Sequence, residues 1–181
     1  MKFIAVVIIT TIACLGYKNT PTVGERYIAH MNTFNADSLN VLLDDSFKLS
    51  RTFAKVTHTK TTFLTQYLPL CQSLHARYDI LEKAGGNPEE ILVQDHSDFF
   101  TLLQIPEPRW KLKIYKTPAN LISKVEIDTT EGYAAYQQTA AFMNTQFVKW
   151  LEETHPDESL NILVADKNNL YSKRLLEFRN R

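Results

Sequence analysis

The stretch 24-GERYIAHMNTFNADSLNVLLDDSFKLSRTF-53 changes its hydrophobic period twice. Over residues 23–34 apolar side chains recur three and four positions apart, which predicts an amphipathic helix. Asn35-Ala36-Asp37 breaks this pattern, and Asp37 or Ser38 can cap a second short helix. In 46-SFKLSRTF-53 the side chains alternate between two faces, as in a half-buried strand. The stretch therefore predicts a helix, a helix and a strand in that order.

The chain after this stretch predicts one more helix and then a sheet. The helix covers residues 57–70 and ends near Pro69. Strand-like runs follow over residues 74–80, 91–104, 110–114 and 121–128. The polar run 95-DHSD-98 interrupts the second of them, and a bulge or a surface-facing segment is the simplest explanation. Helices followed by an antiparallel meander predict the α+β class, with a curled, cone-shaped sheet wrapped around the N-terminal helices.

The C-terminal part, residues 130–181, is helical by its spacing. A long helix over residues 130–154 places five apolar side chains on one stripe: Tyr136, Ala140, Met143, Phe147 and Leu151. We expect this stripe to pack against the body of the protein, and a dimer seam or a lid over a cavity is the alternative. The predicted organisation is a domain over residues 20–129 with a C-terminal helical extension over 130–181.

The composition limits the classes of function. A chain of 181 residues that is 44% hydrophobic can bury one sizeable core, which favours a single domain. The 20 Lys and Arg residues are balanced by 20 Asp and Glu residues, and no basic run is interleaved with aromatic residues. We therefore expect no nucleic-acid partner.

The N-terminal run MKFIAVVIITTIAC has the features of a secretory signal, residues 1–14, and is too short to span a bilayer. Its end resembles the lipobox of bacterial lipoproteins, in which a cysteine, here Cys14, receives the lipid. A plain signal peptide cut near Ala13 or Gly16, or a buried strand of a cytosolic protein, is the alternative. We expect an exported bacterial protein, periplasmic or anchored to the outer membrane, that contacts a membrane only through this anchor. Cys71 would then be a buried thiol without a disulfide partner.

Two short motifs in the opening stretch carry a resemblance to a known superfamily. Arg26-Tyr27 in the first helix and 42-LLDD-45 before the first strand are similar to the corresponding motifs of the ketosteroid isomerases. The chain therefore resembles the nuclear transport factor 2-like superfamily, which includes the SnoaL-like polyketide cyclases, over about residues 22–128. The resemblance implies the cone-shaped fold and a ligand cavity inside it.

The isomerase chemistry itself is not expected. That mechanism needs a tyrosine, a carboxylate base and a protonated aspartate. Tyr27 matches the tyrosine, but the base position falls on Arg51, or on Ser50 with one gap. Residues 111–113, where the second acid belongs, contain no Asp or Glu. Arginine stays protonated and an unassisted serine is not a base, so two of the three groups are missing.

The predicted ligand site is an apolar cavity with one charged group. Its lining is Tyr27, Met31, Phe47, Leu49, Arg51, Tyr78, Trp110 and Leu112. Arg51 shares a strand face with Phe47 and Leu49, and a guanidinium at the cavity mouth favours a carboxylate or phosphate. The alternative is that Arg51 reaches solvent or pairs with a local acid such as Asp98.

Few other side chains suggest chemistry. Tyr27, His30 and Asp98 are weak catalytic candidates, and only Asp95 or Asp98 could bring a carboxylate to the cavity. Asp95, His96 and Ser97 cannot form a hydrolase triad, because neighbouring residues on a strand point to opposite faces. No histidine spacing suggests a metal site, and we expect no cofactor.

We therefore expect a protein that binds a small hydrophobic or acidic molecule without catalysis. The enzymatic alternative is a SnoaL-like lyase, cyclase or isomerase. The second alternative is a protein–protein assembly module, including a homodimer.

Overall fold

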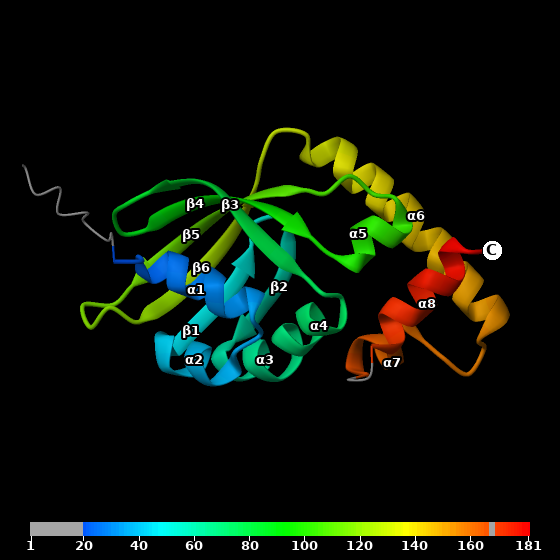
Figure 1. The fold of residues 1–181 in the computed structure, drawn as a ribbon, viewed down its shortest axis with the longest axis horizontal. Helices are drawn as coiled ribbons and strands as arrows, with labels where there is room; N and C mark the ends of the chain where they lie inside the picture. Colours follow the sequence, from blue (N-terminus) through cyan, green and yellow to red (C-terminus); the bar gives the residue numbers. More distant parts are fainter. Residues whose placement is uncertain (1–19, 167–168) are drawn as a thin grey trace, which may run out of the picture.

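The computed structural model describes residues 20–166 and 169–181 (Figure 1). The predicted signal peptide and the lipidation of Cys14 lie outside these residues. None of the described helices has the length and apolar content that a bilayer span requires.

The predicted order of helix, helix and strand is confirmed at the start of the described chain. Helix α1 (Val23–Asn32) begins with a capping box: Glu25 N–H donates to Thr22 Oγ1 over 3.1 Å, and Thr22 N–H donates to Glu25 Oε2 over 2.8 Å. Helix α2 (Ala36–Leu42) is capped by the Asn35 side chain, two or three residues before the predicted caps. Strand β1 (Leu43–Arg51) follows directly.

The described strands form one curled, unclosed six-stranded sheet (Figure 1). After β1 its strands are β2 (Ala54–Thr59), β3 (Arg77–Ala84), β4 (Glu89–His96), β5 (Arg109–Lys116) and β6 (Ile122–Thr129). The order across the sheet is β2-β1-β6-β5-β4-β3. The meander β3 to β6 is antiparallel, as predicted, whereas β6 pairs with β1 in parallel. Strands β2 and β3 form the two edges.

The third helix starts later and runs further than predicted. Residues 57–59 belong to β2, and the helical segment consists of α3 (Lys60–Thr62), a π-helical turn η1 (Phe63–Tyr67) and α4 (Leu68–Ser73). Pro69 does not end this segment, because it lies in the first turn of α4 directly after the wider π turn. A residue without an N–H is tolerated at such a position.

The long strand predicted over residues 91–104 is wrong in its second half. Strand β4 ends at His96, and helix α5 (Asp98–Leu103) begins after Ser97, whose carbonyl accepts from the N–H groups of Phe100 and Thr101. The polar run 95–98 is therefore a strand-to-helix junction and not a bulge. The apolar residues after it pack on helices instead of on the sheet.

Two hydrophobic cores result. The first lies between the concave face of the sheet and α1 to α4. The second is formed by α5 with the C-terminal helices α6 (Tyr133–Thr154), α7 (Leu160–Ala165) and α8 (Leu170–Arg179), which lie together beyond one end of the sheet (Figure 1). On the stripe of α6, Phe147 and Leu151 are buried in this second core. Tyr136 packs against both cores and so joins them.

Candidate functional site

The predicted ligand-binding residues meet on the concave side of the sheet. The pairing Leu49–Val125 and Arg51–Ile127 places Arg51 on the same face as Leu49. Tyr27, Met31, Phe47, Leu49, Tyr78, Trp110 and Leu112 all belong to the first core. Tyr27, Met31, Phe47 and Leu112 are at most 3% exposed and line none of the three pockets described below. This part of the cone is filled with side chains, and ligand binding by these residues stays a prediction.

Polar groups collect at one end of this apolar face, and we call Arg51, Tyr67, Tyr78 and Asp95 the mouth cluster. Arg51 Nη2 donates to Tyr67 Oη over 3.2 Å, and the hydroxyls of Tyr67 and Tyr78 are 3.4 Å apart. Asp95 pairs with Tyr78 across the β3–β4 ladder, and its Oδ2 accepts from Trp110 Nε1 over 2.9 Å. Four strands and the π turn thus bring together the four side chains of the mouth cluster and Trp110.

Asp95 is the member of the mouth cluster that titrates near neutral pH. Burial raises its pKa to about 7, against the opposing effects of the Trp110 hydrogen bond and the positive charge of Arg51. Burial also raises the pKa of the Tyr67 and Tyr78 hydroxyls well above their usual range, and that of the Cys71 thiol to about 12. These three groups therefore remain neutral while Asp95 changes its charge.

A small recess and an aromatic roof border the mouth cluster. The recess, lined in part by Arg51, His58 and Tyr67, has a volume of about 10 Å³, which is room for about one water molecule. The roof consists of Phe53, Tyr133 and Tyr136. Phe53 stacks on Trp110 with ring centroids 5.1 Å apart, and Tyr136 meets the same ring edge-on at 5.6 Å. Behind the roof, a pocket of about 310 Å³ opens between residues 106–110 and the start of α6.

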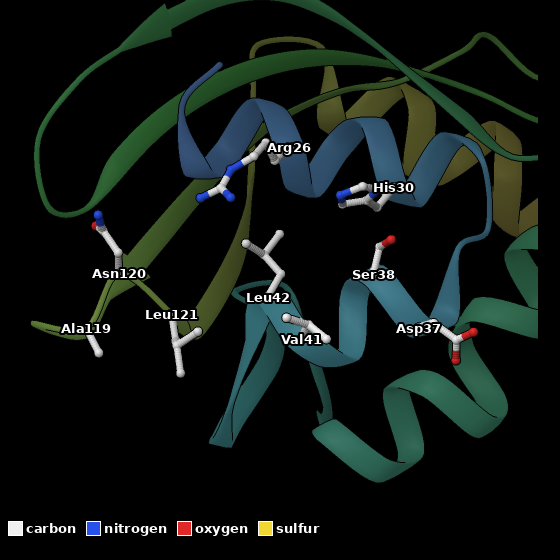
Figure 2. A pocket seen from close by; sticks show the side chains of 9 residues that line it. All are labelled: Arg26, His30, Asp37, Ser38, Val41, Leu42, Ala119, Asn120 and Leu121. Carbon is white, nitrogen blue, oxygen red and sulfur yellow. The ribbon is translucent and has the colours of Figure 1, made fainter. Parts of the chain in front are cut away.

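His30 and Asp98 do not join the mouth cluster. His30 is half-buried and lines a pocket of about 540 Å³ between α1, α2 and the β5–β6 turn (Figure 2), whereas Tyr27 points into the core. Asp98 Oδ2 accepts from Ser172 Oγ and lies 2.7 Å from His75 Nδ1. The expected alternative of an Arg51–Asp98 pair is therefore wrong, because Asp98 is engaged by α8 and the α4–β3 loop.

Asp95, His96 and Ser97 diverge, as the strand geometry predicts. Asp95 turns to Trp110, while His96 lies 2.8 Å from Glu107 and 3.2 Å from Asp79. Within residues 20–166 and 169–181, no three His, Cys, Asp or Glu side chains are placed to hold a metal ion.

Sequence reasoning missed Tyr67 and the partnership of Asp95 with Trp110. Tyr67 lies within the helix predicted over residues 57–70, and the apolar spacing of that segment gives no sign of the hydroxyl contact with Arg51. A signal did exist for Trp110, because a buried indole N–H needs an acceptor, and Asp95 is an acceptor on a neighbouring strand.

Comparison with known proteins gives information on the fold alone. No family model matches the sequence, and no curated protein matches it. Among solved structures, an uncharacterized bacterial protein with a cystatin-like fold from Silicibacter pomeroyi shares 13% identity at a TM-score of 0.51, covering 78% of this chain and 92% of that one. An NTF2-like protein of unknown function from Cytophaga hutchinsonii shares 9% identity at a TM-score of 0.44. The match covers 66% of this chain and 98% of that one. The epoxide hydrolase/cyclase-like enzyme SalBIII, which has a role in pyran ring formation in polyether salinomycin, shares 10% identity at a TM-score of 0.48. The match covers 60% of this chain and 88% of that one.

These similarities define a class by its fold. The chain has the cystatin-like fold of nuclear transport factor 2-like proteins, which confirms the fold expected from Arg26-Tyr27 and 42-LLDD-45.

Proposed function

We propose that the protein binds a small acidic molecule at the mouth cluster. The observation that carries the proposal is the Arg51 guanidinium beside two tyrosine hydroxyls at the end of an apolar face. Guanidinium and hydroxyl groups are the donors that recognise a carboxylate or phosphate, and the adjacent apolar and aromatic side chains suit a hydrophobic body. Below pH 7 Asp95 is mostly protonated, so the cluster then carries the net positive charge of Arg51.

Access to the cluster depends on Arg51. The recess of about 10 Å³ is too small for an organic ligand, but Arg51 is exposed, and among the described residues its side chain forms a hydrogen bond only with Tyr67. Rotation of this long side chain would enlarge the recess at the expense of about one hydrogen bond, which contributes roughly 1 kcal/mol. A ligand anion would then replace Tyr67 as the partner of the guanidinium.

Native mass spectrometry of gently purified protein, compared with the same sample after denaturation, tests this proposal. We expect a bound acidic molecule that is lost in Arg51→Ala and retained in Arg77→Ala, a surface arginine paired with Asp79. Equal retention in the two variants, or a protein without any bound molecule, would count against the proposal. An empty protein at the mass of a dimer would favour the assembly alternative.

One observation favours acid–base catalysis as a second candidate function. A carboxyl group with a pKa near 7 beside phenol hydroxyls is suited to transferring a proton at neutral pH. The two functions have opposite pH dependence. A base needs ionised Asp95, so kcat/KM would rise through about pH 7, whereas affinity for an anion would fall over the same interval.

Asp95→Asn separates these two functions. The amide keeps an oxygen that accepts from Trp110 but cannot ionise, so we expect anion binding to become independent of pH. An enzyme that uses Asp95 would instead lose its activity. Retention of a pH-dependent affinity in this variant would exclude Asp95 as the titrating group.

We also propose that the chain is exported and lipidated at Cys14. The supporting observation is the apolar N-terminal run that ends in Ile12-Ala13-Cys14. Mass spectrometry of the N-terminal peptide from membrane-extracted protein tests it, with Cys14→Ser as the control. An unmodified peptide that begins at Met1 would refute export.

A further inference from the structure

The pocket that contains His30 is separate from the mouth cluster and has walls of two kinds. It lies between α1, α2 and the β5–β6 turn, residues 119–121, and shares no lining residue with the mouth cluster (Figure 2). Its volume is about 540 Å³, within the range of small-molecule sites in proteins. One side presents polar donors and the other presents aliphatic side chains.

The polar side centres on Arg26. Arg26 and His30 are one helical turn apart on α1, and Figure 2 shows the Arg26 guanidinium extending across the opening toward Asn120. In the part of the chain that the structure describes, this exposed guanidinium forms no hydrogen bond or ion pair. The Ser38 hydroxyl points toward His30. Asp37 also lines the pocket, with its carboxylate turned away from Arg26 and His30. The wall therefore offers an unpaired guanidinium beside an imidazole and a hydroxyl group, an arrangement that favours an anion.

The apolar side consists of Val41, Leu42 and Leu121. Val41 is 76% exposed, more than any other large apolar side chain of the described residues, and it lines this pocket together with Leu42, a residue of the first core that is 7% exposed. Isolated exposed valines are common on protein surfaces. Here the exposed valine adjoins a concave surface whose other wall is cationic, so one amphipathic ligand could cover both.

Hydrogen bonds within the protein hold the walls of this pocket in place. The β5–β6 turn is closed by Thr117 N–H donating to the Leu121 carbonyl over 2.8 Å and Asn120 N–H donating to the Thr117 carbonyl over 2.9 Å. Helices α1 and α2 have side-chain caps at Thr22 and Asn35. A preformed site loses little conformational entropy when it binds.

We propose that this pocket binds an aliphatic monocarboxylate of medium chain length. The carboxylate accepts hydrogen bonds from the Arg26 guanidinium, assisted by His30 and Ser38. The hydrocarbon chain lies on Val41, Leu42 and Leu121. A single negative charge matches the one guanidinium, and the nearby Asp37 disfavours a ligand with more negative charge. The site is distinct from the mouth cluster and does not depend on the function proposed for that cluster.

An NMR titration of the full-length protein with decanoate, kept below its micelle concentration, tests the proposal. We expect the amide signals of Arg26, Val41 and Leu121 to shift along one saturable curve. Arg26→Gln keeps most of the side-chain length but removes the charge, and should weaken binding at least about tenfold. Arg77→Gln, another surface arginine, should leave the affinity unchanged. Decanol, with the same chain and no charge, should bind about tenfold more weakly or worse.

Three outcomes would overturn the proposal: an unchanged affinity in Arg26→Gln, equal binding of decanol, or shifts confined to Trp110 and Asp95. Val41→Asp gives an independent check, because it places a negative charge in the apolar wall at an exposed position and should abolish binding. Shifts of Trp110 and Asp95 that disappear in Arg51→Ala would report on the mouth cluster, whereas shifts of Arg26, Val41 and Leu121 report on this pocket. Failure of the mouth-cluster proposal and failure of this one are therefore separate results.

Discussion

At the scale of single residues, the most informative side chain is Asp95. Its carboxyl group is surrounded by apolar side chains and neutral hydroxyls, and its one indole donor does not offset the loss of water. The charged or titratable groups that face it are Arg51 on β1, the tyrosines at 67, 78 and 136, Cys71, and the neighbouring His96 and Glu107. Asp95 is therefore a site where the fold tolerates a cost in stability, as functional groups often require.

The pH dependence of stability should reveal this cost. The folded protein keeps the Asp95 proton up to about pH 7, whereas the unfolded chain releases it near 3.8, so the folded state binds more protons between these values. Stability therefore falls as pH rises across this window, by up to ~4 kcal/mol for a three-unit shift. We expect Asp95→Asn to remove this fall, so that it is more stable than the wild type above pH 7.

Urea unfolding at about pH 5 and about pH 8 measures this difference. Asp79→Asn is the control, since its side chain is half exposed. If wild type and Asp95→Asn lose stability equally between the two conditions, the buried carboxyl is not the source of the effect.

The sequence could predict where Arg51 points but not the chemistry of Asp95. Alternation along β1 was enough to place Arg51 on the concave face. The pKa of Asp95 depends on burial and on Trp110, Arg51 and Glu107, which come near its carboxyl group only in the folded chain. Desolvation is a property of the assembled core, so it leaves no local pattern in the sequence.

At the scale of elements, the close contact of α1 with β4 depends on a residue that has no side chain. Gly24 lies in the first turn of α1, and a Cβ there would be 2.6 Å from Ile91 Cδ1 and 2.8 Å from Glu89 Oε1. Glu89 is buried and accepts hydrogen bonds from Thr22 Oγ1 and Gly24 N–H. The helix can therefore approach the sheet this closely only with glycine at position 24.

We expect Gly24→Ala to destabilise the protein by about 1–3 kcal/mol, because the added methyl group must displace Ile91 and Glu89. Gly85→Ala is the matched control, since a Cβ at Gly85 has no atom within 4 Å. Chemical denaturation of both variants measures the difference. An equal free energy of unfolding for the two would show that α1 moves away from β4 at little cost.

Elements with a strong period were predictable, and elements shaped by their neighbours were not. Helix α1 and strands β1 and β5 follow their apolar spacing. Strand β2 is a short edge strand, 54-AKVTHT-59, with only one aliphatic β-branched residue. Its strand pattern is therefore weak, and the helical spacing of the residues that follow extends the predicted helix back over its last residues. Helix α5 has an unbroken apolar run because it packs inside the second core, and such a run does not distinguish a strand from a buried helix.

At the scale of the whole molecule, the two cores share contacts and should unfold together. Tyr136 packs in both, and Asp98 links α8 to the His75 loop. The two tryptophans report on different cores, Trp110 on the first and Trp150 on the second. Variants with a single tryptophan, Trp150→Phe or Trp110→Phe, therefore allow each core to be followed by fluorescence.

We expect Leu175→Ala to cost about 2–5 kcal/mol, because it leaves a cavity in the second core. Both tryptophan signals should shift to the same lower midpoint. The neighbouring Leu176→Ala, at a position 48% exposed, should change the stability by no more than about 0.5 kcal/mol. A shift of the Trp150 signal alone would mean that the C-terminal helices unfold independently of the cone.

The parallel pairing of β1 with β6 also determines when the cone can form during synthesis. Strand β1 leaves the ribosome early and can form a hairpin with β2, but its other edge is matched only by residues 122–129. Until residues 122–129 emerge, this edge of β1 has no partner strand. The pairing then closes the long loop between β1 and β6, which is a slow step. The nascent chain must therefore remain incomplete, with one open strand edge, until the meander has been made, and this interval is when chaperones would be most needed.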